Sequence, residues 1–229
     1  MTSRHQFGIV ALVLASALLG GCATTATQQK TEWDGLVRQP HPRLAAVFVR
    51  PAIQEDMAAF RSVMLDPVDV SFSSEFERSR RAGITSRRLD ADDLAAIQRN
   101  LADQFQQVFR EELQGGGYEV VDKPGPDTLR VSAAIVDLFI TAPEATQPIG
   151  RSRTYTADSG RMTLVLELRE SVTGEILVRA VDARSGRNTG TLSLANRATN
   201  TADARRALRI WARALREGLD EFNARQATQ

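Results

Sequence analysis

Cys22 is the residue whose type and surroundings most clearly predict a chemical reaction, and it is the only cysteine among the 229 residues of the chain. Its thiolate is a strong nucleophile. Gly20 and Gly21 precede it and leave the backbone open to a peptidase. An apolar run over residues 8–19 follows Arg4. This run suits a secretory signal and is shorter than the about 20 apolar residues that span a bilayer.

Leu19, Gly20, Gly21 and Cys22 resemble the lipobox of bacterial lipoproteins, position by position. The resemblance implies a signal peptide over residues 1–21, a diacylglycerol on the Cys22 sulfur and an acyl chain such as palmitate on its new amine. Each buried methylene contributes about 0.8 kcal/mol, so several chains hold a protein stably. The alternative is an ordinary cleaved signal with an unused thiol. The residue after the cysteine is Ala23. An aspartate at this position commonly retains lipoproteins at the inner membrane, so Ala23 favours attachment to the periplasmic leaflet of the outer membrane.

Charge and motifs limit the function classes. Leaving out Arg4 of the predicted signal, 28 basic residues balance 28 acidic ones, which argues against nucleic acid as a partner. His41 is the only histidine after the signal and lies between two prolines, so neither a metal site nor a cofactor is predicted. The chain lacks GxSxG, SxxK and HExxH motifs. We therefore expect a protein that is not an enzyme, although scattered carboxylates leave a hydrolase open.

Two irregular segments, Ser73–Leu89 and Thr141–Gly160, carry the candidate contacts with a partner. Long loops on rigid scaffolds often bind ligands, and arginine clusters bind anionic groups. Neighbouring acids such as Glu75 and Glu77 equally predict a solvated face that is paired within the chain. The candidate contact residues are Arg78, Arg80, Arg81, Arg87, Arg88, Arg151, Arg153 and Tyr155.

Hydrophobic periodicity predicts one α+β domain over residues 33–223, between a lipidated tether over 22–32 and a frayed tail over 224–229. We expect a single, mostly antiparallel sheet of five to six strands, with two amphipathic helices packed on one face. The first helix runs from Asp90 to a stop at Gly115–Gly117, and the second spans about 201–222. The second is basic and amphipathic, so it either covers the sheet or lies on a membrane. The predicted strands are 44–50, 63–72 with a phase shift at Pro67, 118–122, 128–140, 162–169 and 175–184.

Several separated segments resemble the bacterial lipoprotein family catalogued as domain of unknown function 3313. They are WDGLV, VMLDPVDV, PGPDTLRVSAAIVDL, ELRESVTGEILVRAVDAR and WARALREGLDEF. The element order also resembles, more loosely, the amino-terminal domain of TolB and curli-secretion lipoproteins. The resemblance implies an envelope lipoprotein and no catalytic residues. We expect a non-catalytic binding or structural module with an envelope protein as a possible partner; the alternative is an accessory subunit of an envelope transport or assembly machine.

Overall fold

A computed structural model of the protein describes residues 31–32, 34–51, 60–83, 89–140, 155–156, 160–186, 193–194 and 197–226. In chain order the elements are β1 (Thr31–Glu32), β2 (Leu36–Gln39), β3 (Ala46–Val49), β4 (Ser62–Leu65), β5 (Asp69–Phe72), α1 (Ser74–Arg81), α2 (Ala91–Gly115), β6 (Glu119–Val121), β7 (Thr128–Ile140), β8 (Tyr155–Thr156), β9 (Gly160–Glu170), β10 (Ile176–Ser185), β11 (Ser193–Leu194) and α3 (Arg197–Gln226). The predicted signal peptide lies outside this part of the chain. The tether and the tail lie largely outside it, and the division of the chain stays a prediction.

One mixed sheet forms the centre of the molecule, with nine strands in the described part of the chain. Its hydrogen-bonded order is β1-β2-β3-β10-β9-β7-β4-β6, and β5 pairs with β7 beyond the end of β4. Strand β4 is parallel to β6 and to β7, and β5 is parallel to β7. The remaining neighbours in this sheet are antiparallel. The predicted α+β class with a single main sheet is confirmed. The prediction of five to six mostly antiparallel strands was wrong, because the sheet is larger and mixed.

The parallel part of the sheet arises because β4 lies between β6 and β7. The turn from β6 to β7 is short enough for an antiparallel hairpin, but the two strands do not pair with each other. The backbone N–H groups of Arg61 and Ser62 donate to the Asp127 carbonyl at 2.9 and 3.3 Å. The Ser62 hydroxyl also lies 2.8 Å from that of Thr128. These contacts hold the start of β4 against the start of β7. The irregularity predicted at Pro67 lies between β4 and β5, so the single strand predicted over 63–72 is two strands.

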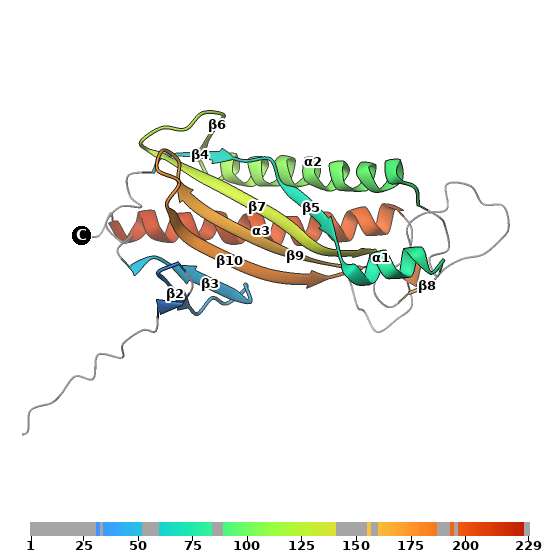
Figure 1. The fold of residues 1–229 in the computed structure, drawn as a ribbon. Coiled ribbons are helices and arrows are strands. Elements are labelled where there is room, and N and C mark those ends of the chain that lie inside the picture. Colours follow the sequence, from blue (N-terminus) through green and yellow to red (C-terminus); the bar gives the residue numbers. More distant parts are fainter. Residues whose placement is uncertain are drawn as a thin grey trace, which may run out of the picture.

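Helices α2 and α3 lie side by side along one face of the sheet (Figure 1). Helix α2 begins where predicted, because the Asp90 side chain accepts from the backbone N–H of Asp93 at 2.8 Å and completes a capping box. On α3, Leu208 and Trp211 are buried in the core, which favours the sheet-covering role over the membrane-surface alternative. Among the described helices, none combines the length and the apolar character needed to cross a bilayer.

Helix α1 occupies part of the segment that was predicted to be an irregular loop, so that prediction was wrong. Ser73 caps the helix by accepting from the backbone N–H of Phe76 at 3.1 Å. Phe76 is fully buried and stacks on Phe72, with 4.8 Å between ring centroids. Because a single apolar side chain fixes this helix among many charged ones, the sequence shows no apolar stripe there.

Two buried charged residues, Arg179 and Asp182, lie three positions apart on β10. Arg179 is 5% exposed and pairs with Glu167 at 2.7 Å and with Asp34 at 2.9 Å. Burial opposes its charge, but the hydrogen bonds to these carboxylates outweigh it and raise the pKa of Arg179. Asp182 is also 5% exposed and accepts from the backbone N–H of Ala45 at 3.0 Å. These pairs join β10 to β9 and to the chain around β2 and β3.

Candidate functional site

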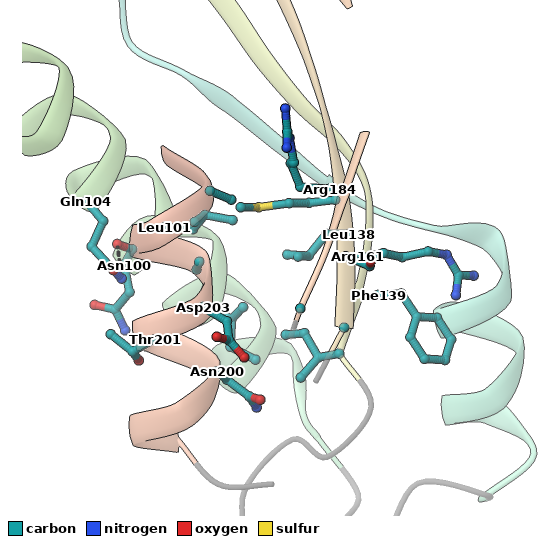
Figure 2. Close-up of a pocket in the computed structure, with 18 of the residues that line it drawn as sticks. Asn100, Leu101, Gln104, Leu138, Phe139, Arg161, Arg184, Asn200, Thr201 and Asp203 are labelled. Atoms are coloured by element: carbon teal, nitrogen blue, oxygen red, sulfur yellow. Dashed lines mark hydrogen bonds between the residues drawn. The ribbon is translucent and has the colours of Figure 1, made fainter. Parts of the chain in front are cut away.

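A cavity of about 530 Å³ opens between the amino-terminal halves of α2 and α3 and the adjacent ends of β7, β9 and β10. Figure 2 shows its side chains. The volume lies within the range of small-molecule sites, which are typically 300–1,000 Å³. Ligand sites also form commonly between packed elements of this kind. We therefore take this cavity, called the helix–sheet pocket below, as the candidate functional site.

The strand wall of the pocket contains an irregularity in β7. Asp137 has a φ of +55°, and the register between β7 and β9 shifts between Val136 and Phe139. Such bulges bend a strand and increase its twist. Opposite them, Gly160 has a φ of +140°, and an added Cβ there would lie 2.4 Å from the Phe139 carbonyl oxygen. The close approach therefore requires glycine at the start of β9.

The helix wall is lined by small side chains. Ala96 on α2 and Ala204 and Ala207 on α3 line the pocket, and each contributes a single methyl group. Larger side chains at these positions would occupy the space between the helices and the strand ends. The floor is apolar, because Leu101 and Met162 are each 6% exposed. The pocket therefore offers a largely hydrocarbon interior to a ligand.

Uncharged polar groups and carboxylates form the rim. Asn100, Gln104 and Gln107 recur at spacings of four and three, so they share one face of α2. The Gln104 side-chain amide donates to the Asn100 backbone carbonyl at 3.2 Å, as drawn in Figure 2. The remaining rim groups include Asp93, Asp103, Asn200, Thr201 and Asp203.

Two of the rim carboxylates already have structural partners. Asp93 is part of the α2 capping box, and Asp203 forms an ion pair with Arg206 at 2.7 Å.

In the described part of the chain no group of three or more metal-ligating side chains is found. His41 lies away from the pocket and accepts from the backbone N–H groups of Arg43 and Leu44, both at 3.1 Å. The imidazole therefore shapes the turn before β3.

Of the eight predicted contact residues, the structure describes the side chains of three, Arg78, Arg80 and Arg81. Arg80 and Arg81 on α1 pair with Glu77 at 2.9 and 3.9 Å, and Arg78 donates to Ser74 at 3.4 Å. These three side chains thus have partners within their own helix. Tyr155 belongs to β8, and its side chain is not described. Cys22 with Leu19, Gly20 and Gly21, and the arginines Arg87, Arg88, Arg151 and Arg153, lie outside the described residues.

Sequence reasoning missed the helix–sheet pocket as a site. A signal was present, because the polar Asn100, Gln104 and Gln107 run beside the apolar stripe of α2. Amides in this pattern also occur on ordinary solvated helices, so the pattern alone does not identify a site. The pocket requires α3 and the ends of three strands, and no local pattern brings these together.

Comparison with known proteins gives a family and a set of distant structures. The model of the family described as Protein of unknown function (DUF3313) matches residues 29–215. This match confirms the family resemblance drawn from the sequence segments. No curated protein matches the chain significantly.

Solved structures with a similar chain path come from several bacteria. The PelC dodecamer from Paraburkholderia phytofirmans is 12% identical, with 79% of this chain and 96% of that chain covered and a TM-score of 0.37. A minor lipoprotein from Acinetobacter baumannii is 11% identical, with coverages of 73% and 95% and a TM-score of 0.33. A DUF330 protein from Xanthomonas campestris is 12% identical, with coverages of 74% and 89% and a TM-score of 0.38. No functional conclusion follows from likeness at this level.

Proposed function

The chain belongs to the DUF3313 family of proteins of unknown function, and from this premise we propose that it is a lipid-anchored envelope protein whose domain binds an apolar ligand in the helix–sheet pocket. The observation that carries the proposal is the cavity of about 530 Å³ itself, with its hydrocarbon floor and its rim of uncharged polar groups and carboxylates. A pocket of this composition suits binding, because apolar surface supplies affinity and a few polar groups supply orientation.

The proposal favours binding over catalysis because of how the rim carboxylates are used. A general acid–base pair needs carboxyl groups that are available to a substrate. The Asp93 carboxylate accepts from the Asp90 backbone N–H in the α2 cap, and the Asp203 carboxylate pairs with Arg206. Asp103 is exposed, but a single available carboxyl group does not make an acid–base pair. We therefore propose that this protein is not a hydrolase at this pocket.

Mass spectrometry of the native protein tests ligand binding. The lipidated chain, purified from the envelope, should carry a non-covalent small-molecule adduct. Ala204→Phe, which fills the pocket, should lose this adduct. Ala202→Phe is the matched control, because Ala202 is exposed on the same helix and does not line the pocket. Equal adducts in both variants, or none in the wild-type protein, would contradict the proposal.

The membrane attachment rests on residues 19–22 and has its own test. Cys22→Ala should leave the precursor uncut and without diacylglycerol, as seen by mass measurement of the purified protein. Fractionation should place the wild-type protein in the outer membrane. Normal maturation and membrane retention of the Cys22→Ala variant would contradict the proposed lipid attachment, and would not affect the proposed ligand binding in the pocket.

An accessory subunit of an envelope machine is the second candidate. The observation in its favour is α1, a short helix at the end of the sheet (Figure 1) on which Arg78 and Arg81 are exposed to solvent although they also contact Ser74 and Glu77. Crosslinking in living cells, followed by mass spectrometry, should then recover one partner in constant proportion. Loss of that partner in a variant with Arg78, Arg80 and Arg81 changed to alanine would assign the contact to α1.

A further inference from the structure

Residues 200–206, near the amino terminus of α3, line the helix–sheet pocket but pack weakly on the rest of the molecule. Asn200, Thr201, Asp203 and Ala204 of this segment line the pocket, and Figure 2 labels the first three. Every side chain over 200–206 is half-buried or exposed. Segments with so few buried side chains open locally at a low cost in free energy. Residues 200–206 are called the α3 wall below.

From Leu208 onward, α3 is fixed firmly on the sheet and on α2. Leu208 is fully buried, and the Trp211 indole donates to the buried Asp182 carboxylate at 2.8 Å. Further along, the Arg216 Nε donates to Glu112 of α2 at 2.9 Å. The attachment of the helix therefore changes abruptly just before Leu208, and a movement of the α3 wall would pivot there.

The facing part of α2 is held more firmly than the α3 wall. The first turn of α2 is capped by Asp90 and contains Asp92 and Asp93, whose charges suit the positive end of a helix. The first turn of α3 contains no acidic residue. The Gln98 side-chain amide also donates to the Val70 backbone carbonyl of β5 at 2.6 Å. Of the two helices that border the pocket, α3 therefore has the less constrained beginning.

A hydrogen bond at the rim joins the α3 wall to α2. Arg205 Nη2 donates to Oε1 of Gln107, a pocket-lining residue, at 3.1 Å. This bond is exposed, so water can replace it at little cost. The Nε–H of Arg205 is buried and has no acceptor among the described residues. Its missing hydrogen bond disfavours the closed position of the wall, and outward movement would let water reach it.

We infer that the α3 wall pivots just before Leu208 and is the entrance through which a ligand reaches the helix–sheet pocket. The hydrogen bond between Gln107 and Arg205 holds this entrance closed. The entrance role rests on the proposed binding function, whereas the movement itself can be measured without a ligand.

Hydrogen exchange followed by mass spectrometry tests the movement, with the full lipidated chain in phosphatidylcholine nanodiscs. Residues 201–206 of α3 and 95–100 of α2 lie at equal distances from the first residues of their helices, Arg197 and Ala91. Ordinary fraying of a helix end would therefore affect both segments alike. After correction for intrinsic rates, exchange in 201–206 should be about tenfold faster than in 95–100.

Gln107→Glu tests the hydrogen bond that closes the wall, because a carboxylate there would form an ion pair with Arg205. An exposed pair of this kind should slow exchange in 201–206 by about twofold to fivefold. The matched control is Gln107→Glu combined with Arg205→Ala, compared with Arg205→Ala alone. It makes the same charge change without the partner and should not slow exchange. Circular dichroism and thermal unfolding confirm that each variant is folded.

The entrance role is tested by stopped-flow fluorescence with N-phenyl-1-naphthylamine, an uncharged apolar probe. The signal of Ala204→Phe, which fills the pocket, is subtracted to remove probe that partitions into lipid. Gln107→Glu should lower the association and dissociation rate constants of the probe together, by the same about twofold to fivefold, because both steps pass through the opened wall. The control pair that lacks Arg205 should show no such joint fall.

The outcomes separate the inference from the proposed function. Equal exchange in 201–206 and 95–100 would overturn the inference, and so would an effect of Gln107→Glu that does not depend on Arg205. Saturable probe binding would still support the proposed function in both cases. Absence of any difference in probe signal between wild type and Ala204→Phe would instead remove the proposed function, and the entrance role with it.

Discussion

The indole Nε1–H of Trp211 on α3 donates to the Asp182 carboxylate on β10 at 2.8 Å. Both residues are buried, with Trp211 1% exposed and Asp182 5% exposed. The same carboxylate accepts from Arg184 and from the backbone N–H of Ala45. One buried acid thus ties the covering helix to the sheet and to the chain before β3. Burial of this charge is tolerated because its hydrogen bonds compensate for the lost water.

We expect Asp182→Ala to lower the free energy of unfolding by about 3–5 kcal/mol, because it leaves buried donors without an acceptor. Trp211→Phe should cost about 1–3 kcal/mol. Urea unfolding of both variants and of the double variant measures their coupling. Simple additivity of the two losses would show that the hydrogen bond contributes nothing to stability.

Tyr118 should make stability depend on pH in the alkaline range. Its hydroxyl donates to Asp220 at 2.9 Å, and burial together with this carboxylate raises the pKa of Tyr118 to about 12. The unfolded value is about 10. Because the folded state favours the protonated phenol, its contribution is complete below pH 10 and is lost as the pH rises from about 10 to 12.

Ultraviolet absorbance of tyrosinate measures this titration directly. The chain has two tyrosines, Tyr118 and Tyr155, so the Tyr118→Phe variant identifies the later transition. This variant should also lose the decline in stability between pH 10 and 12. A wild-type protein in which both tyrosines titrate near 10 would contradict the assignment.

Gly160→Ala should destabilise the fold by about 1–3 kcal/mol, because the new Cβ meets the Phe139 carbonyl and φ is positive. Gly218→Ala is the control of opposite sign. It lies inside α3, where an added Cβ meets nothing within 4 Å, and should stabilise the protein by about 0.5–1 kcal/mol. Thermal unfolding compares the two; equal effects would show that the bulge does not constrain this position.

On α1, the charged residues and the buried aromatic residue should differ sharply in their effect on stability. Phe76→Ala should cost about 3–5 kcal/mol, because Phe76 is fully buried against Phe72 and Phe139. Arg81→Ala should change stability by less than about 0.5 kcal/mol, because its ion pair with Glu77 is exposed. Urea unfolding measures both, and a large loss in Arg81→Ala would show that the charged face organises the helix.

Strong local patterns predicted the elements that they specify. The apolar stripe and the caps placed α2, and hydrophobic periodicity placed the strands 162–169 and 175–184, which the structure shows paired as β9 and β10. The sequence did not predict α1, because only Phe76 anchors it. Nor did it predict the insertion of β4 between β6 and β7, because hydrogen bonds between Ser62 and residues 127–128 decide that order. Pairing order is a tertiary property, and short strands carry little of it.

The helix–sheet pocket was beyond sequence reasoning for a related reason. Its alanines look like ordinary helix residues, and its glutamines look like solvated surface. Only the packing of α2 against α3, together with the bulge near Asp137, brings them around one cavity. The predicted lipid attachment at Cys22 depends on a contiguous motif, and such motifs can be recognised without knowledge of the fold.

The most direct test of the proposed binding function is methyl NMR of the methionines in the lipidated protein during titration with N-phenyl-1-naphthylamine. Met162 lines the helix–sheet pocket, whereas Met64 lies on β4 outside it and serves as the internal control. We predict a saturable shift of the Met162 methyl resonance, an unchanged Met64 resonance, and loss of the shift in Ala204→Phe. A Met162 resonance that stays fixed at saturating probe would contradict ligand binding in this pocket.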